Sequence, residues 1–349
     1  MPNFPEKRRH MKKRTIVEGE VHHVYQRTGG GVVVFYSIRD YLVFFTIVCT
    51  MAEQEDVTLL ALCPMPDHLH NACRVKNHEQ LARFVQQYTR IYSHEWNTHH
   101  ARKGSLFQNR FGSAPKVGNK KVRTCINYVY NNPVERKMVQ NAEQYRWNFL
   151  AYARCRNPFS RPIILSQASR PLRGALAEAK KCRQEGQWLH YAQLDRWMRK
   201  LSAAEIQQLT DAIVGLWNII DYEDAISYYG SRDAMVRSFH DNTGSEYDIR
   251  EDTDKYSDAV YADCNRILLH DGFVRSVREI PSLPLSSKLE LYHLLVNRTA
   301  AKPGQVRKYL HFQSALFGAE NNQHLVDSQP LTCHTAQQKN AGSLGGSLR

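Results

Sequence analysis

Residues 57–75 read VTLLALCPMPDHLHNACRV and contain the stretch on which the expected fold depends. Two runs rich in strand-forming residues, 57–63 and 68–75, flank residues 64–67, which read PMPD. Prolines and an aspartate between two such runs are typical of a turn. The sequence therefore predicts two neighbouring strands joined by a tight connection.

His68 and His70 lie on the second of these strands. Residues two apart on a strand point to the same face, so both imidazoles would stand side by side and bind one divalent cation, while Leu69 faces the core. Histidine pairs at this spacing also occur at surfaces or in satisfied buried positions. The pair alone does not decide between these interpretations.

The segments on either side alternate between strand and helix patterns. Asp40 is suited to cap the first helix, and Pro133 is expected to end the last one. The resulting order, β-α-β-β-α-β and then a helix, predicts an α+β fold: a ferredoxin-like sandwich with an added helix. The predicted strands are residues 20–27, 32–36, 57–63, 68–75 and 104–111, and the predicted helices are residues 41–53, 77–97 and 120–131.

The chain of 349 residues is long enough for two or three domains. Two prolines, Pro158 and Pro162, indicate a linker, and the pattern beyond it is mainly α-helical, with one long helical stretch expected at 172–215. The expected organisation is a basic N-terminal arm at 1–15, a first domain at 16–156, a helical C-terminal region at 170–317 and a disordered tail at 318–349.

The net charge of +13 is unevenly distributed. Residues 101–200 carry 21 basic and 5 acidic side chains, a net charge of 21 − 5 = +16. Residues 201–260 carry 4 and 13, a net charge of 4 − 13 = −9. The basic excess predicts a polyanionic partner, and a solvated basic surface is the alternative. The acidic stretch is expected to pack against the basic domain or to mask it.

Several classes of protein can be set aside. The longest apolar run, Tyr41–Ala52, is too short to cross roughly 30 Å of hydrocarbon, and no apolar segment follows the basic N-terminus, so we expect neither a membrane protein nor a secreted one. The eight cysteines form no C-x-x-C pair, which favours free thiols in the cytoplasm. No G-x-x-x-x-G-K-[ST] loop occurs, so we expect no nucleotide cofactor.

Residues 125–134, CINYVYNNPV, form the second chemically suggestive segment. Tyr128 and Tyr130 would stand about 200° apart on a helix, so only one of them can face the histidines. A free phenol has a pKa of about 10 and is a weak nucleophile, but a nearby cation would favour the phenolate and polarise a phosphate oxygen. A packed helical tyrosine is the alternative interpretation.

Together these segments resemble a known family, the single-tyrosine HUH transposases, and in particular the REP-associated tyrosine transposases. The family pairs an M-P-N/D-H-h-H segment, in which h is apolar, with a later Y-I-x-x-N-P-V segment. This chain has MPDHLH at 65–70 and YVYNNPV at 128–134. The resemblance extends in order over about residues 16–150. Its supporting matches are HHVYQR at 22–27, DYLVF at 40–44 and SLFQNRFGS at 105–113.

The resemblance implies an HUH nuclease domain whose added helix is catalytic. His68 and His70 would hold Mg²⁺ or Mn²⁺, and Tyr128 would attack a DNA phosphodiester, forming a 5′-phosphotyrosine link and releasing a 3′-OH. Asn132, four residues after the tyrosine, would complete the metal site. The alternative for Asn132 is the N-cap of a short following helix that has Pro133 at its first position.

Two departures from the family pattern concern the same segments. The histidine strand continues as Asn71–Arg74 where apolar residues are usual, and Tyr130 stands where histidine is common. Two histidines make a modest site for a cation that prefers oxygen, so phosphate, water and Asn132 would have to complete it. Neither departure removes a residue with a catalytic role.

Candidate DNA contacts fall in two places. Residues 101–123 hold basic side chains with no acid among them, interleaved with Phe107 and Phe111, which suits single-stranded or hairpin DNA. Residues 287–312 resemble a helix-turn-helix. The candidate contacts are Arg102, Lys103, Arg110, Lys116, Lys120, Lys121 and Arg123 in the first segment and Gln305, Arg307 and Lys308 in the second.

The leading hypothesis is a metal-dependent transposase-like endonuclease that nicks and rejoins single-stranded, hairpin-forming DNA. One alternative is a non-catalytic, sequence-specific DNA-binding protein that uses its C-terminal helices. Another is a metal nuclease that activates water and forms no covalent intermediate. The sequence leaves open whether the protein is a monomer or a homodimer.

Overall fold

The computed structural model describes residues 15–108, 110–241 and 256–312. The chain divides into two units, Met1–His311 and Phe312–Arg349, and all the helices and strands described below belong to the first. The basic arm expected at 1–15, except residue 15, and the tail expected at 318–349 lie outside the described residues.

Within the described residues, four strands form one antiparallel sheet in the order β2-β3-β1-β4. The strands β2 and β3 are the predicted hairpin, and Pro66-Asp67 forms its turn. The element order agrees with the predicted β-α-β-β-α-β order followed by a helix. The elements of this half are β1 (Val21–Arg27), α1 (Ile38–Gln54), β2 (Thr58–Met65), β3 (His68–Arg74), α2 (His78–His99), β4 (Gly112–Lys116) and α3 (Asn119–Glu135).

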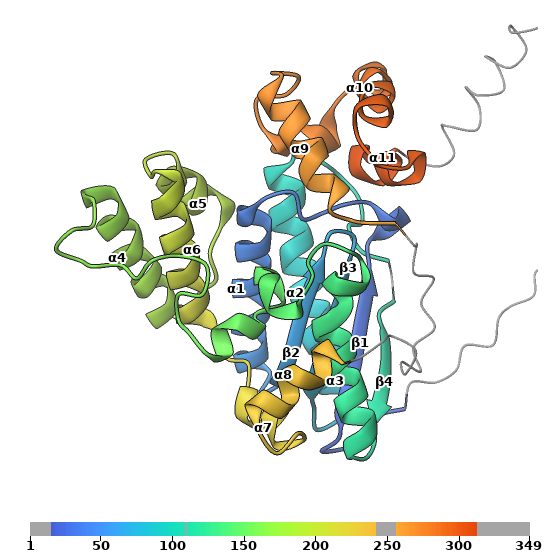
Figure 1. The fold of residues 1–349 in the computed structure, drawn as a ribbon, viewed down its shortest axis with the longest axis vertical. Helices are drawn as coiled ribbons and strands as arrows, with labels where there is room; N and C mark the ends of the chain where they lie inside the picture. Colours follow the sequence, from blue (N-terminus) through green and yellow to red (C-terminus); the bar gives the residue numbers. More distant parts are fainter. Residues whose placement is uncertain (1–14, 109, 242–255, 313–349) are drawn as a thin grey trace, which may run out of the picture. The chain divides into compact units, whose positions relative to one another are not determined.

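The two faces of the sheet are covered by different helices (Figure 1). Strand β3 presents Asn71 and Cys73 toward Tyr88 of α2. On the other face, His70 contacts Tyr128 of α3. The alternation along β3 follows from strand geometry, in which successive side chains point to opposite faces. It places the histidine pair between the sheet and α3, while Leu69 is buried, as predicted.

Two of the predicted strands are wrong. Residues 32–36 are buried but form no strand, because their backbone groups bond to the hairpin turn and to α11 (Pro303–Leu310): Val33 N–H donates to the carbonyl of Lys308 and Val34 N–H to that of Pro66. Among the described residues of 104–111, the strand-like pairing is an isolated bridge between Phe107 and Thr28. The edge strand β4 starts at Gly112 instead.

Two helix boundaries differ from the prediction: the end of α3 and the start of α1. Helix α3 continues through Pro133 to Glu135, so the prediction that Pro133 ends it, and the interpretation of Asn132 as an N-cap, are wrong. A proline so near the end of a helix removes few hydrogen bonds. Helix α1 is capped by Ser37 rather than by Asp40, which is the third residue of a capping box.

The second half is mainly helical. The stretch expected to be one long helix at 172–215 is three helices, α4 to α6, and α6 packs on α1. None of the described helices combines the length and the apolar character that a membrane crossing needs. The helices are α4 (Arg170–Gln184), α5 (Tyr191–Met198), α6 (Ala203–Trp217), α7 (Tyr222–Ser227), α8 (Arg232–His240), α9 (Val260–His270), α10 (Leu285–Arg298) and α11 (Pro303–Leu310).

Buried Asp40 joins the two halves. Its Oδ1 accepts hydrogen bonds from Tyr191 of α5 at 2.7 Å and from His100, just after α2, at 3.2 Å, and its Oδ2 caps the start of α1 through Ser37. Burial alone would raise the pKa of the Asp40 carboxyl, but the hydrogen bonds from His100, Tyr191 and Ser37 and the charge of His100 outweigh it, so the pKa is lowered. These partners therefore favour the charged form of the Asp40 carboxylate.

We expect Asp40→Asn to lower the free energy of unfolding by about 3–5 kcal/mol at neutral pH, because one partner of a buried charged network is lost. A lowered folded-state pKa stabilises the protein fully above pH ~4 and ceases to do so as the pH falls through that lowered value. The difference between wild type and variant should thus shrink below pH ~4. Urea denaturation from pH 7 to pH 3 measures it, with exposed Asp263→Asn as the control. A difference that is independent of pH would contradict this account.

Candidate active site

The histidine pair, Tyr128 and His23 form one cluster between the sheet and α3. The rings of His68 and His70 are 4.9 Å apart between centroids, and the ring of Tyr128 meets that of His70 edge-on at 5.1 Å. Tyr130 points elsewhere, because its hydroxyl donates to the carbonyl of Leu60. The prediction that only one of the two tyrosines can face the histidines therefore agrees with the geometry, and that tyrosine is Tyr128.

His68 is held at both ring nitrogens. Its Nδ1 bonds Asp67 Oδ1 at 2.6 Å, and its Nε2 lies 3.1 Å from Asn132 Oδ1. The Nζ of Lys308, on α11, lies 3.2 Å from the other carboxylate oxygen of Asp67. Burial alone would raise the pKa of Asp67, but the hydrogen bond and charge of His68 and the charge of Lys308 outweigh it and hold that pKa well below its usual range. Asp67 is therefore an anion that orients His68.

His70 is held by a residue that the sequence analysis did not single out. Its Nδ1 lies 3.1 Å from Nε2 of His23, on the neighbouring strand β1. Burial, followed by the charge of Lys116, lowers the pKa of His23 to about 3. Burial also lowers the pKa of His70 well below 6.5, and the charges of His68 and His23 add to the effect. Burial therefore favours the neutral form of both imidazoles.

The donor atoms suit a small divalent cation. Among the described residues no group of three or more His, Cys, Asp and Glu side chains is placed to hold a metal ion. The candidate donors are instead the two imidazoles and the amide of Asn132. Adjacent ligands of an octahedral Mg²⁺, at 2.0–2.1 Å from the metal, are about 3 Å apart. The 3.1 Å between His68 Nε2 and Asn132 Oδ1 fits two such ligands of one cation.

The predicted helix-turn-helix segment forms the hairpin of α10 and α11, but two of its candidate DNA contacts face inward. Gln305 is buried and donates to the carbonyl of Ser257 at 2.9 Å, and Lys308 bonds Asp67. Arg307 is exposed. The helix that was expected to read DNA thus presents one of the three predicted side chains to solvent and directs another to the histidine site.

The basic segment 101–123 is mostly accessible. The guanidinium of Arg102 donates to the carbonyls of Gly104 and Ser105, so it also shapes its own loop. Arg123 donates to the carbonyl of Tyr228 at 3.2 Å. The remaining predicted contacts are exposed or half-buried: Lys103, Arg110, Lys116, Lys120 and Lys121. Their contact with DNA stays a prediction.

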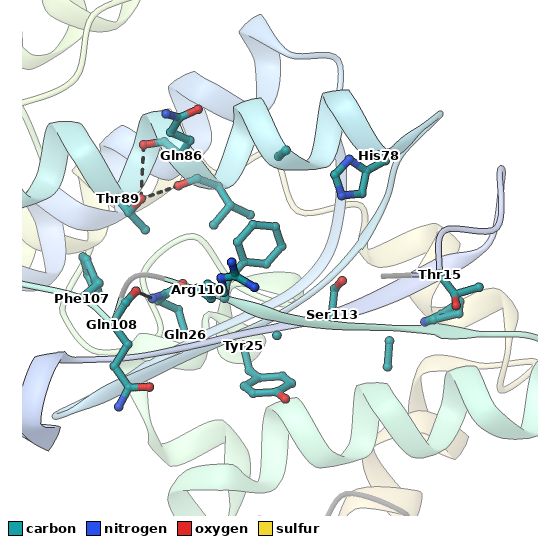
Figure 2. Close-up of a pocket in the computed structure, with 16 residues that line it drawn as sticks. Thr15, Tyr25, Gln26, His78, Gln86, Thr89, Phe107, Gln108, Arg110 and Ser113 are labelled. Atoms are coloured by element: carbon teal, nitrogen blue, oxygen red, sulfur yellow. Dashed lines mark hydrogen bonds between the residues drawn. The ribbon is translucent and has the colours of Figure 1, made fainter. Parts of the chain in front are cut away.

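A groove of about 1100 Å³ lies between α2 and the edge strand β4. Figure 2 shows Gln86 and Thr89 of α2 on one side of it and Arg110 with Ser113 on the other. Phe107 is buried, whereas Phe111 is half-buried and lines the groove.

Tyr25 connects this groove with the histidine site. It lines the groove and stacks on His23, with centroids 5.6 Å apart. Its ring lies over Gly112, where a Cβ would overlap it. The rings of Tyr25, His23, His70 and Tyr128 form a row on the face of the sheet that α3 covers.

The fold and the site define an α+β protein in which a histidine pair on a central strand faces a helical tyrosine. Residues 33–132 match the family model described as "Transposase IS200 like". The matched range contains His68, His70, Tyr128 and Asn132, and it confirms, for this part of the chain, the resemblance to the single-tyrosine transposases.

The comparisons with solved structures and with curated proteins gave weaker results. A solved structure described as a REP-associated tyrosine transposase bound to a REP hairpin shares 14% sequence identity with this chain. The match covers 41% of this chain and 86% of that one, with a TM-score of 0.35. A likeness of this size says nothing by itself about substrate or activity. No curated protein matches the chain significantly.

The inward position of Lys308 can be tested by its effect on stability. We expect Lys308→Met to lower the free energy of unfolding by about 1.5–3 kcal/mol, because a hydrogen bond to a charged, buried carboxylate is lost. Lys302→Met, at the exposed N-cap residue just before the same helix, removes only an exposed contact with the Tyr256 ring and should change it by less than about 1 kcal/mol. Urea denaturation of both variants measures this. Equal, small effects would show that Lys308 is not engaged with Asp67.

Proposed function

We propose that this protein is a metal-dependent endonuclease and strand transferase that nicks and rejoins single-stranded DNA next to a hairpin through a covalent tyrosine intermediate. The observation that carries the proposal is the convergence of His68, His70, Asn132 and Tyr128 in one buried cluster, within the range that matches the transposase family. Residues 16–156 would be a ferredoxin-like HUH nuclease domain with α3 as its catalytic helix.

The proposed reaction exchanges one phosphate ester for another. Tyr128 Oη would attack the phosphorus, the phenol would lose its proton, the bond from phosphorus to the 3′ oxygen would break, and that oxygen would take up a proton. The phosphotyrosine ester retains the energy of the broken bond, so a 3′-OH can later reverse the step. No nucleotide hydrolysis is needed, in keeping with the missing phosphate-binding loop.

His68, His70 and Asn132 would hold the divalent cation, Mg²⁺ or Mn²⁺, as their donor atoms and spacing suggest. When bound, such a cation supplies Lewis-acid stabilisation of charge on the phosphate. Asp67 keeps His68 oriented with Nε2 toward Asn132, an outer-shell arrangement that is usual for metal-binding histidines. The match of residues 33–132 to the family model of IS200-like transposases supports this proposal.

The DNA would approach along β4. The groove between α2 and β4 offers half-buried Phe111 as a stacking surface and Arg110 as a cation, and Tyr25 at its border stacks on His23 of the cluster. Stacking on aromatics combined with backbone charge is how proteins bind single strands. Lys120 and Lys121 at the start of α3 extend the basic track toward the helix that carries Tyr128.

The covalent mechanism makes a prediction about Tyr128. We expect Tyr128→Phe to abolish cleavage of a single-stranded hairpin substrate and the protein–DNA adduct seen on denaturing gels, because the attacking oxygen is gone. DNA affinity should stay within about twofold of wild type. Tyr130→Phe is the matched control on the same helix: its hydroxyl bonds Leu60, so the variant should still cleave and form the adduct.

Each alternative function has its own outcome in this experiment. Cleavage by Tyr128→Phe at the wild-type rate would indicate a nuclease that activates water. Sequence-specific hairpin binding without cleavage by the wild-type protein would indicate a DNA-binding protein.

The metal site makes a separate prediction. We expect EDTA, and the variant His68→Ala, to reduce cleavage at least a hundredfold while hairpin binding in a gel-shift assay persists, since backbone contacts come from other residues. Excess Mg²⁺ or Mn²⁺ should restore the chelated wild type but not the variant. Cleavage that is insensitive to EDTA would refute the metal assignment, and loss of binding together with cleavage would point to a structural role for His68.

A further inference from the structure

The two histidines of the pair are held by buried partners in similar ways. His68 is bonded at Nδ1 by Asp67, and His70 is bonded at Nδ1 by His23. Asp67 is the residue before His68 in the sequence, whereas His23 is on a different strand, 47 positions from His70. His23 therefore contributes to the cluster only through the tertiary fold.

The position of His23 is closely determined. It is 1% exposed, and it lies on the central strand β1, where its Cα pairs with that of Ala72 in β3. Its ring is nearly parallel to that of His70, with an interplanar angle of 11°, and meets the ring of Tyr128 edge-on at 5.5 Å. One side chain thus contacts both a metal-ligand candidate and the proposed nucleophile.

The hydrogen bond between the two imidazoles restricts how His70 can act. In a bond between two neutral imidazoles, one nitrogen donates and the other accepts. If His70 Nδ1–H donates to His23 Nε2, then Nε2 of His70 carries the lone pair that a metal requires. If His23 donates, Nε2 of His70 must carry the proton and cannot coordinate.

We infer that His23 is a positioning residue for the metal site: it accepts a hydrogen bond from His70 Nδ1 and so holds His70 in the tautomer and orientation that bind a divalent cation. The inference rests on the proposed function, because it concerns the same cation site. It extends that function to a residue outside the histidine and tyrosine segments, within the supporting match at 22–27.

The adjacent residue provides a matched control. His22 is also a histidine of β1 and is 0% exposed, but it points to the opposite face of the sheet, where its Nε2 accepts from the backbone N–H of Val17 at 3.2 Å. Replacing His22 therefore disturbs the same strand to a similar degree without touching the cluster.

The experiment compares Mn²⁺ affinity, measured by titration calorimetry on the full chain without DNA. His23→Leu introduces an apolar side chain of similar bulk and removes the hydrogen-bond acceptor. We expect this variant to bind Mn²⁺ 10–100-fold more weakly, as is usual when an outer-shell partner of a metal ligand is lost. His23→Gln, whose amide oxygen can accept from His70, should recover most of the affinity. His22→Leu should bind within about twofold of wild type even if it unfolds more easily.

A second measurement reports the tautomer directly. With ¹⁵N-labelled histidine, wild-type His70 should show the Nδ1–H tautomer in long-range ¹H–¹⁵N spectra, and His23→Leu should shift it toward Nε2–H. Folded His23→Leu that binds Mn²⁺ like wild type, with an unchanged His70 tautomer, would overturn the inference and leave the proposed function standing. Wild-type protein that binds no Mn²⁺, either alone or with hairpin DNA supplying the phosphate, would overturn both.

Discussion

The site depends on one constraint: each of the two imidazoles on β3 is bonded at Nδ1 by a buried partner. Asp67 holds His68, and His23 holds His70. An imidazole is flat and free to rotate about two bonds, so a strand alone places its Cβ but not its nitrogens. The two Nδ1 bonds supply the missing orientation. The bond to Asp67 turns Nε2 of His68 toward Asn132 on α3. A helix and three strand-borne side chains thus become one cluster.

The C-terminal helices bear on this cluster as well. Helix α11 directs Lys308 to Asp67, and the carbonyls of Lys308 and Tyr309 accept from Val33 and from the hydroxyl of Tyr36. A helix with so many bonds to the segment before α1 is a structural neighbour of the histidine site. The electrostatic consequence is direct, because the lysine charge helps to keep Asp67 ionised and therefore able to accept from His68.

Sequence patterns predicted the architecture of the first half well, for physical reasons that are local. The hairpin, the helix α2 and the result that only one of Tyr128 and Tyr130 faces the histidines follow from periodicity, which acts within a few residues. The strand expected at 32–36 is absent because a β-rich segment becomes a strand only if a neighbouring strand takes its hydrogen bonds. Val33 and Val34 bond to a helix end and a turn instead. Similarly, the helix tolerates Pro133 because so little of α3 follows it.

The sequence by itself determined the chemical types at the site: two histidines on one face of a strand, an aspartate before them, and a tyrosine and an asparagine one helical turn apart. These depend only on backbone periods of two and 3.6 residues. Only the tertiary structure decided that His23 and not His22 reaches His70, and that Lys308 faces Asp67 and not solvent. Both outcomes depend on strand register and helix docking, and such long-range packing leaves no periodic trace in the chain.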